Sequence, residues 1–309
     1  MKLGIVGAGA VGQACALSAV MRGGAAEIVV VDRTARRAQG LVTDLRYGAV
    51  LAPAVQVRAG TYADLAGAGL VLLTAGVNEK AGGATDRADP QGRLKLLAKN
   101  AEIFRDIVPQ IASAAPDATL LIVTDPPDAL ADIARRTAPG MRVLSAGTFL
   151  DSLRFRVHLA HRLDVHPLSV EALVVGEHGT SSVFLWSAAR VGGRPVAAVL
   201  DGTEAVRGAV EKEVREANIE IIEGTGASQL GIGMVCARIV EIMARDERAV
   251  VPIGSYAAEF GVTLSLPSVL GRNGVLRVIQ PALTPQEAEG LRASARHIRD
   301  ALEEAGAGS

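Results

Sequence analysis

A glycine-rich turn near the N-terminus sets the fold of the first half of the chain. Residues 7–12 read Gly-Ala-Gly-Ala-Val-Gly and connect a short apolar run, Leu3–Val6, to a stretch with helical periodicity. A second apolar run, Ile28–Val31, ends at Asp32, about 20 residues after Gly12. A strand, a glycine turn, a helix and another strand in this order predict a βαβ unit with parallel strands.

The spacing of the glycines and the acid is typical of a dinucleotide-binding turn. Gly7 permits the tight turn, Gly9 lets the backbone approach a pyrophosphate, and Gly12 allows the helix to pack closely on the strand. Free N–H groups at the start of the helix would bind the phosphates. Asp32 would accept hydrogen bonds from the adenosine ribose and repel a 2′-phosphate, so the turn predicts NAD rather than NADP. Three arginines that could pair with a 2′-phosphate follow this acid and leave NADP open: Arg33, Arg36 and Arg37.

Short apolar runs alternate with helical stretches as far as about residue 146. This alternation predicts further βαβ units and therefore a doubly wound parallel sheet of the Rossmann type. Beyond residue 146 the pattern changes to α+β. We therefore predict an α/β protein with a dinucleotide-binding domain, residues 1–146, and a substrate and catalytic domain, residues 147–309. The predicted strands of the first half are Leu3–Val6, Ile28–Val31, Val55–Val57, Leu70–Leu73, Leu120–Val123 and Val143–Leu144.

Caps and turn signals predict the elements of the second half. Residues 284–287, Thr-Pro-Gln-Glu, combine an N-cap hydroxyl, a proline at the first helical position and a glutamate three residues after the cap, which predicts a last helix to about Glu304. Asn273-Gly274 predicts a hairpin turn within Val262–Ile279. The other predicted segments are the helices Phe149–Leu163, Thr203–Glu223 and Ser228–Ala244, the extended run Val170–Val175 and a turn at Gly192-Gly193.

The composition excludes several classes of function. The formal charge is −1 at pH 7 and the pI is about 6.5, so no strong field attracts nucleic acid or an anionic membrane. No apolar run reaches the roughly 20 residues that a bilayer span needs. The two cysteines, Cys15 and Cys236, predict buried free thiols in a reducing compartment. Because the first predicted strand starts at Leu3, no room is left for a leader peptide, and we expect a cytoplasmic protein whose partner is a small molecule.

Two segments of the second half are more specific than the glycine turn. Residues 147–156 read Gly-Thr-Phe-Leu-Asp-Ser-Leu-Arg-Phe-Arg, and residues 176–180 read Gly-Glu-His-Gly-Thr. With the glycine turn, they resemble the L-lactate/L-malate dehydrogenase family, and the similarity extends to Arg93–Phe104, Gly231–Val240 and Asn273-Gly274. The resemblance implies an oxidoreductase that transfers a hydride between NAD(H) and a small 2-hydroxy or 2-oxo acid. It also implies a homo-oligomer, with a tetramer favoured over a dimer.

Interconversion of a 2-oxo acid and a 2-hydroxy acid needs a proton carrier, a cation for the carboxylate and a group that polarises the carbonyl. His178 suits the first task, and Asp151 could hold its ring in one tautomer and stabilise the imidazolium. By resemblance, Arg154 binds the substrate carboxylate with its two-pronged guanidinium, and Arg93 polarises the carbonyl. Ser228 takes the place of a small hydroxyl residue beside the substrate.

The remaining predictions concern the cofactor and metals. The further predicted NAD contacts are Val11, Thr74, Ala75 and Gly76. His158 and His161 have a spacing that could suggest a metal. No third ligand is evident near them in the sequence, so we predict no metal site.

The loop after the fourth predicted strand departs from the family pattern. Glu79 takes the position at which lactate enzymes carry glutamine and malate enzymes carry arginine. Arg93 falls in register with Asn100 only if the loop holds an insertion of several residues, which could close over a longer substrate side chain. An acid at position 79 argues against oxaloacetate unless Arg87 folds in to supply a cation. The alternative is that Glu79 points to solvent and the insertion has no role.

A second departure from the family pattern lies directly before a proline. Residues 124–128 read Thr-Asp-Pro-Pro-Asp, where the family usually has an asparagine before the first proline. An ionised Asp125 can only accept hydrogen bonds, and a carboxylate beside a developing alkoxide opposes ketone reduction. Asp125 must therefore be protonated, paired with a cation, or facing a substrate group that carries hydrogens. Together with Glu79 it suggests a substrate with an ammonium or guanidinium tail, and an imine in place of the ketone is the bolder possibility.

The altered loop and Asp125 keep an alternative open, namely an NAD-binding homologue that has lost efficient chemistry and acts as a sensor. The joint presence of His178, Asp151, Arg154 and Arg93 argues against this alternative. A third class, the NAD-dependent glycosidases of similar fold, would need metal-ligating residues that we cannot place in the sequence.

Overall fold

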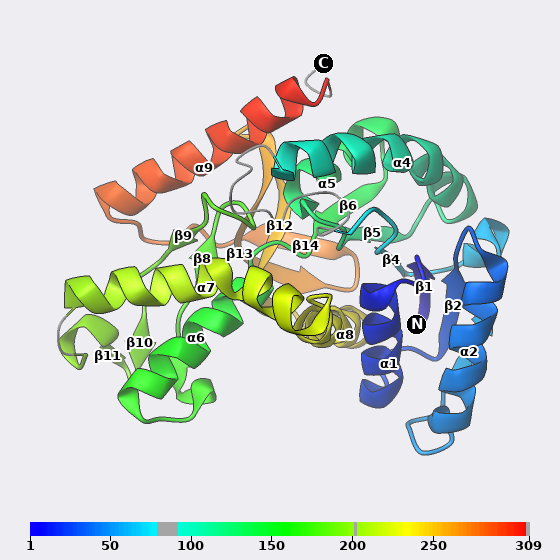
Figure 1. Ribbon diagram of the computed structural model, residues 1–309, viewed down its shortest axis with the longest axis horizontal. Coiled ribbons are helices and arrows are strands. Elements are labelled where there is room, and N and C mark those ends of the chain that lie inside the picture. The colour runs from blue at the N-terminus through cyan, green and yellow to red at the C-terminus, as the bar shows by residue number, and fades with distance from the viewer. Residues whose placement is uncertain (79–91, 201–202, 307–309) are drawn as a thin grey trace.

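The computed structural model describes residues 1–78, 92–200 and 203–306, and the first half of this part is built on six parallel strands. They are β1 (Lys2–Val6), β2 (Glu27–Val31), β3 (Gln56–Ala59), β4 (Leu70–Leu73), β5 (Thr119–Ile122) and β6 (Arg142–Ser145). The α-helices between them are α1 (Ala10–Arg22), α2 (Ala35–Ala49), α4 (Gly92–Ala114) and α5 (Pro127–Thr137). The strands lie in the order β3-β2-β1-β4-β5-β6, and Figure 1 labels all of them except β3. The order therefore reverses between β1 and β4, which is where sheets of this kind bind ligands.

Three antiparallel strands of the second half extend the same sheet. They are β12 (Ala249–Ala257), β13 (Val262–Gly271) and β14 (Gly274–Val278), and β12 pairs with β6 between Gly254 and Ser145. The two halves of the described chain thus share a nine-stranded sheet, beside which the short strands named below form a three-stranded and a two-stranded sheet. The α-helices of this half are α6 (Phe149–Leu163), α7 (Thr203–Thr225), α8 (Leu230–Arg245) and α9 (Pro285–Glu304). Its short strands are β7 (Val170–Glu171), β8 (Val174–Val175), β9 (Val183–Phe184), β10 (Arg190–Val191) and β11 (Arg194–Pro195).

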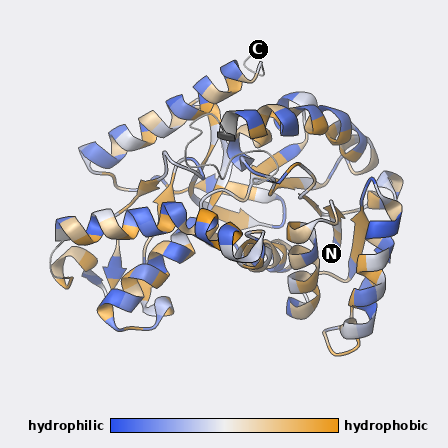
Figure 2. Cartoon of the chain, viewed as in Figure 1, coloured by the Kyte–Doolittle hydropathy of each residue, from blue (hydrophilic) through white to orange (hydrophobic). Residues whose placement is uncertain are grey.

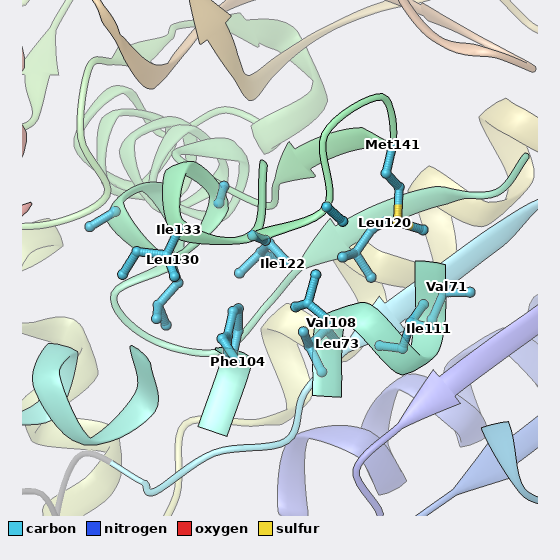
Figure 3. Close-up of a cluster of buried hydrophobic side chains, with 14 of the residues drawn as sticks. Val71, Leu73, Phe104, Val108, Ile111, Leu120, Ile122, Leu130, Ile133 and Met141 are labelled. Carbon is cyan, nitrogen blue, oxygen red and sulfur yellow. The ribbon is translucent and has the colours of Figure 1, made fainter. Parts of the chain in front are cut away.

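Both faces of the central strands are buried, which explains their nearly continuous apolar sequences. Along β4, Leu70 and Leu72 belong to the core beneath α1, α2 and α8, whereas Val71 and Leu73 belong to the core beneath α4, α5 and α9. Figure 3 shows Val71 and Leu73 in the second of these cores with Phe104 of α4. Figure 2 shows hydrophobic and hydrophilic residues alternating along the helices, as expected for helices with one face on a sheet.

The structure confirms most predicted elements. Every predicted strand of the first half is present, with bounds that differ by at most two residues, and the helix Phe149–Leu163 has the predicted bounds. The last helix begins with the predicted capping box. Thr284 Oγ1 accepts from the Glu287 N–H at 3.2 Å, and Glu287 Oε2 accepts from the Thr284 N–H at 2.9 Å. Turns at Gly192-Gly193 and at Asn273-Gly274 connect strands as predicted.

The structure corrects the sequence analysis in one respect that matters for the architecture. Strand β12 is not predicted from the sequence, because Pro252, Gly254 and Ser255 interrupt its apolar pattern. Through this strand the second half of the chain completes the sheet of the first half. The predicted parallel sheet therefore continues into an antiparallel part.

Two predicted elements of the second half differ in detail from the structure. The extended run Val170–Val175 has the predicted ends but is divided into two short strands, and between them the carbonyl of Ala172 accepts a hydrogen bond from Arg156 Nε at 3.1 Å. The helix predicted from Ser228 begins at Leu230. Ser228 therefore lies in the turn before α8.

Helix α8 packs directly against α1, the helix that follows the glycine turn. Gly233 is buried at this contact, and a Cβ on it would lie 2.7 Å from the carbonyl carbon of Ala14. Cys15 and Cys236 are buried free thiols, as predicted. They are also neighbours in space, since a hydrogen bond with Cys15 and burial raise the pKa of the Cys236 thiol. The helix behind the glycine turn is thus anchored to the second half of the chain.

No single helix within the described ranges is long and apolar enough to cross a membrane. Only α7 and α8 taken together have the length and composition of a membrane span, and the two helices are bent by 117° at the break between them. Much of α8 is buried in the core beside α1.

We expect Gly233→Ala to lower the free energy of unfolding by about 1–3 kcal/mol, because the added methyl overlaps the α1 backbone at a close-packed contact. Gly40→Ala is the matched control. Gly40 lies within α2 with no atom near its Cβ position, so alanine should stabilise the protein by about 0.5–1 kcal/mol. Denaturant unfolding followed by circular dichroism measures both changes, and equal effects would contradict the close contact between α1 and α8.

Candidate functional site

The glycine turn lies at the carboxyl end of β1 and leads into α1, whose N-cap is Gly9. Gly7 has a φ of 110°, which glycine adopts readily, and a Cβ there would lie 2.6 Å from the Ala75 nitrogen. A Cβ on Gly12 would lie 1.9 Å from the Gly7 oxygen, so the helix packs on the turn at a distance that only glycine permits. A Cβ on Gly9 would meet no atom within 4 Å. The backbone at Gly9 therefore faces open space, where a phosphate can approach.

Asp32 lies directly after β2, next to the glycine turn. Its Oδ2 accepts a hydrogen bond from the Ala8 N–H at 2.8 Å, and its Oδ1 accepts one from the Thr34 N–H at 2.8 Å. These bonds fix the carboxylate beside the turn. Each carboxylate oxygen can accept a second hydrogen bond, which suits the diol of a ribose.

Two loops that follow β4 and β5 are tied to the glycine turn and to each other. Thr74 Oγ1 donates to the Gly7 carbonyl at 3.0 Å. Asn100 of α4 is buried and joins the loops, because its Oδ1 accepts from the Val77 N–H at 2.7 Å and its Nδ2 donates to the Asp125 carbonyl at 2.9 Å. Side-chain to main-chain hydrogen bonds therefore set the spacing of these segments.

A cavity of about 260 Å³ lies between the glycine turn and the second half of the chain. The predicted site residues that line it are Gly9, Val11, Thr74, Gly76, Asp125, Arg154, His178 and Ser228. Those that do not line it are Gly7, Gly12, Asp32, Ala75 and Asp151. A smaller hollow of about 30 Å³ is lined by Asp151 and again by Arg154 and His178. The fold thus brings predicted cofactor and catalytic residues from opposite halves of the sequence to one cavity.

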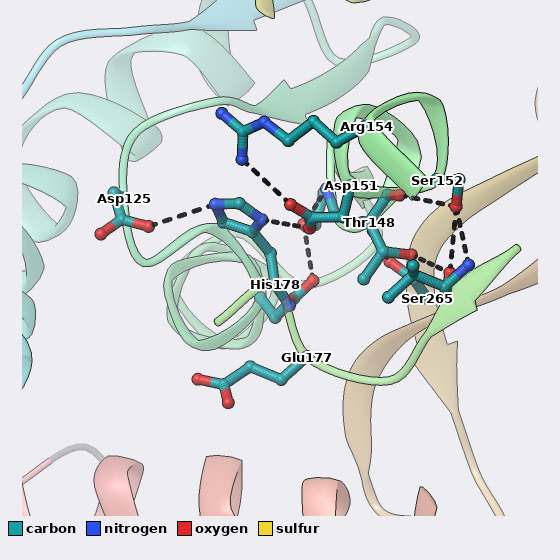
Figure 4. A network of polar contacts seen from close by, with 12 residues as sticks. Asp125, Thr148, Asp151, Ser152, Arg154, Glu177, His178 and Ser265 are labelled. Carbon is teal, nitrogen blue, oxygen red and sulfur yellow. Dashed lines mark hydrogen bonds and ion pairs between the residues drawn. The ribbon is translucent and has the colours of Figure 1, made fainter. Parts of the chain in front are cut away.

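Three charged side chains meet on one wall of this cavity (Figure 4). Asp151 and Arg154 lie on α6, and His178 follows β8. His178 Nδ1 lies 2.6 Å from Asp151 Oδ2, and Arg154 donates to Asp151 Oδ1 at 3.2 Å. Burial alone would raise the pKa of Asp151, but the charges and hydrogen bonds of His178 and Arg154 outweigh burial and hold this pKa below its usual value. An ionised Asp151 makes Nδ1 the donor and leaves Nε2 of the ring for the cavity.

Asp125 faces the other nitrogen of the same ring. Its Oδ1 lies 3.9 Å from His178 Nε2, and Figure 4 shows the imidazole between Asp125 and Asp151. The side chains of Asp125 and His178 are 16% and 21% exposed, so both are accessible from the cavity. Carboxylates at both nitrogens favour the protonated form of the ring.

Sequence reasoning missed three residues near the site. Asn100 and Asp128 are buried side chains whose partners include main-chain groups far away in the sequence, and such pairs leave no local pattern. Asn218 of α7 lines the cavity and the smaller hollow. The only signal for Asp128 is its place in an otherwise apolar helix start, residues 127–131.

Three side chains that are predicted to lie near the substrate are outside the described part of the chain. Glu79 and Arg87 fall within residues 79–91, outside the described ranges, and the side chain of Arg93 is not described either. Their roles stay predictions. Within the described ranges, no three His, Cys, Asp or Glu side chains come together to hold a metal ion.

Comparison with known proteins gives matches along nearly the whole chain. The model of the lactate/malate dehydrogenase NAD binding domain matches residues 1–143, and that of the α/β C-terminal domain matches residues 148–308. An L-lactate dehydrogenase of Deinococcus radiodurans is 44% identical over 304 residues and covers 97% of each chain. One of Allorhizobium ampelinum is 44% identical over 312 residues, which cover 97% of this chain and 98% of the relative.

Solved structures give the same result. A lactate dehydrogenase from a Medee basin deep-sea metagenome library superposes with a TM-score of 0.90 at 33% identity, over 99% of this chain and 98% of that one. The minor L-lactate dehydrogenase of Enterococcus mundtii superposes with a TM-score of 0.89 at 34% identity, over 98% of this chain and 97% of that one.

Asp151→Asn should lower the pH at which the His178 ring loses its proton by at least about one unit, because it removes a negative charge in hydrogen-bond contact with Nδ1. Nuclear magnetic resonance of labelled histidine measures this midpoint, and a His178→Asn variant identifies the signal. Glu213→Gln is the matched control, since Glu213 Oε2 lies 2.8 Å from His158 Nδ1 and should affect only that ring. An unchanged His178 midpoint in D151N would contradict the pairing.

Proposed function

Because the chain belongs to the lactate/malate dehydrogenase family and is an NAD-dependent 2-hydroxy acid dehydrogenase, we propose that its substrate carries a cationic group besides the acid on which the reaction takes place. The observation that carries this proposal is the Asp125 carboxylate, 3.9 Å from His178 Nε2 on the wall of the cavity. The roles of the individual site residues, given next, belong to the same proposal.

The chain's own residues bind the acid and move a proton. The start of α1 would hold the pyrophosphate of NADH and Asp32 its adenosine ribose, and the cofactor would supply the hydride. Arg154 binds the substrate carboxylate. His178 donates a proton from Nε2 to the oxygen at C2 as the ketone is reduced and removes it in the reverse direction, while Asp151 stabilises the imidazolium. The further proposed substrate contacts are Ser228, Arg93 and Glu79.

With an uncharged substrate side chain, Asp125 competes with the substrate for the proton of His178. The imidazolium N–H then lies between a carboxylate and a carbonyl, and the carboxylate is the stronger acceptor. A carboxylate at this place also opposes the negative charge that develops on the carbonyl oxygen. An ammonium or guanidinium group on the substrate would pair with Asp125, end this competition and leave the Nε2 proton for the carbonyl.

The charges of the described part of the site support the same choice. Arg154 and a protonated His178 are balanced by Asp151 and Asp125. A 2-oxo acid with an uncharged side chain adds one negative charge, whereas one with a cationic tail adds none, and unbalanced charge is costly away from water. Asn218 on the cavity wall offers an amide to a polar tail.

We expect the protein to prefer 2-oxo-5-guanidinopentanoate over 2-oxohexanoate, an uncharged analogue, by at least about tenfold in kcat/KM, which is the effect of one charge-assisted hydrogen bond. Steady-state oxidation of NADH measures this, with pyruvate and oxaloacetate in the same panel. Equal or faster turnover of pyruvate or oxaloacetate would refute the cationic substrate. Binding of NADH without turnover of any compound would favour the sensor alternative.

Asp125→Asn should reverse this preference, because an amide can donate to the carbonyl oxygen and cannot pair with a cation. We expect kcat/KM to rise about tenfold with pyruvate and to fall about tenfold with the guanidino acid. Asp164→Asn, at the exposed C-cap of α6, is the matched control and should change neither value. Loss of activity with every compound in D125N would show that Asp125 serves the chemistry itself and not the choice of substrate.

We also propose that the chain assembles with copies of itself, as a homotetramer rather than a dimer. Helices α1, α2 and α8 and the segment after α2 surround a hollow of about 700 Å³. Apolar side chains around it are strongly exposed, among them Met21 at 67%, Leu51 at 94% and Leu230 at 71%. Gathered apolar side chains of this kind are typical of contacts between subunits.

The cytoplasmic location and the domain division after residue 146 remain part of the proposal, and the two free thiols fit a reducing compartment.

Leu51→Arg should dissociate the assembly, because it places a charge in this apolar face at little cost to the folded subunit, in which Leu51 is 94% exposed. Leu276→Arg is the control at an exposed leucine outside this face. Light scattering during gel filtration gives the mass in multiples of the 31.9 kDa chain. A single-chain mass for the unmodified protein would refute the assembly, and a two-chain mass would correct the tetramer to a dimer.

A further inference from the structure

We infer that Asp128 is a positioning residue for the reaction, which holds the main chain of His178 from the first turn of α5. Asp128 does not line the cavity, so it acts through His178 and not on the substrate. Asp125, three residues earlier and just before α5, lies with Oδ1 3.9 Å from Nε2 of the same histidine. Residues 125–128 therefore contact His178, the proton carrier, both at its backbone N–H and at ring nitrogen Nε2.

Both oxygens of Asp128 are engaged, and the side chain is 1% exposed. Oδ2 accepts from the His178 N–H at 2.7 Å, and Oδ1 accepts from the Ser145 hydroxyl at 2.7 Å. Ser145 Oγ in turn accepts from the Gly147 N–H at 2.9 Å. A Cβ on Gly254 would lie 2.8 Å from Asp128 Oδ1, so the carboxylate has little room to move. A single carboxylate thus joins α5, the end of β6 and the loop that carries His178.

The place of the imidazole depends on this contact. The His178 backbone is held by Asp128, and ring nitrogen Nδ1 is held by Asp151 at 2.6 Å. Because the backbone and Nδ1 of His178 are both held, the position of Nε2 is fixed as well. Proton transfer requires hydrogen-bond reach, and a displacement of about 1 Å in such a site can cost about 100-fold in rate.

The charge of Asp128 also acts on His178. Burial raises the pKa of Asp128 to about 7, against the hydrogen bonds from the His178 N–H and Ser145 and the attraction of the His178 ring, while the nearby charge of Glu177 raises it further. Above this pH the ionised carboxylate stabilises the imidazolium. Because the pKa of the folded state lies above the usual 3.8, the contribution of Asp128 to folding stability is lost as pH rises through about 4 to 7. Stability at alkaline pH therefore does not explain this buried acid.

Asp132 supplies a matched control one turn further along α5. It is also buried, its Oδ2 accepts from the Thr263 N–H at 2.7 Å, and its Oδ1 accepts from the Thr263 hydroxyl at 3.0 Å. Burial raises its pKa as well. These partners lie on β13 and not on the loop of His178. Asp132→Asn therefore removes a comparable buried carboxylate without touching the proton carrier.

Asp128→Asn and Asp132→Asn are compared in the full chain, with whichever of pyruvate and 2-oxo-5-guanidinopentanoate the unmodified protein reduces faster. The test therefore does not depend on the cationic substrate. Above pH 7, where Asp128 is ionised, we expect kcat in D128N to fall about tenfold with little change in KM, the difference between a charge-assisted and a neutral hydrogen bond. Because the imidazolium of His178 then loses a stabilising charge, the pH above which the rate of reduction falls should move to a lower value. D132N should lower the thermal midpoint of unfolding and leave kcat and the profile unchanged.

Two further measurements test the role of Asp128 if D128N does not fold or if neither compound is turned over. Ser145→Ala removes one hydrogen bond from Asp128 and should move the profile in the same direction by a smaller amount. Resonance titration of labelled His178 without substrate should give a lower midpoint in D128N, or in S145A, than in D132N. An unchanged profile, an unchanged midpoint, or equal kinetic losses in D128N and D132N would overturn the inference and leave Asp128 a residue of stability alone.

Discussion

The site requires the carboxylate of Asp151 to stay ionised although it is buried away from water. Asp151 is buried on α6, and an unpaired buried charge would cost several kcal/mol. The hydrogen bonds and charges of His178 and Arg154 offset this cost. Because the groups come from separate elements, the fold must hold these elements in register. Thr148 at the start of α6 does so, since its N–H donates to Ser265 of β13 at 3.0 Å.

The parts of the site that could be predicted are those in which one short segment carries both the residue type and its structural context. Gly7, Gly9 and Gly12 are such residues, because a strand precedes them and a helix follows. Asp151 and Arg154 are also such residues, because one helix presents both, and the structure places them at one cavity or hollow with His178. The Rossmann order of the first six strands follows from the alternation of apolar and helical stretches.

What escaped prediction depends on contacts between segments that are distant in the sequence. Asp128 reads as an ordinary first-turn acid until the fold brings the backbone of His178 to it. Asn218 looks like one more polar residue on a mostly polar helix, and only the position of α7 beside the cavity gives it a place at the site. Strand β12 escaped prediction for a related reason, since its proline and small residues give no local strand pattern and the strand is defined by its pairing with β13 and β6.

The join between the halves limits how a chain of this kind can diversify. Because β12 pairs with β6 and α8 packs on α1, a recombined protein with halves from two relatives would have to match at Gly254 and Ser145 and again at Gly233 and Ala14. The turn at residues 124–126 and the turn at residues 226–228 lie outside the β6–β12 pairing and the α1–α8 contact. New chemistry should therefore evolve through single substitutions in these turns, while the sheet and the contact between α1 and α8 stay unchanged.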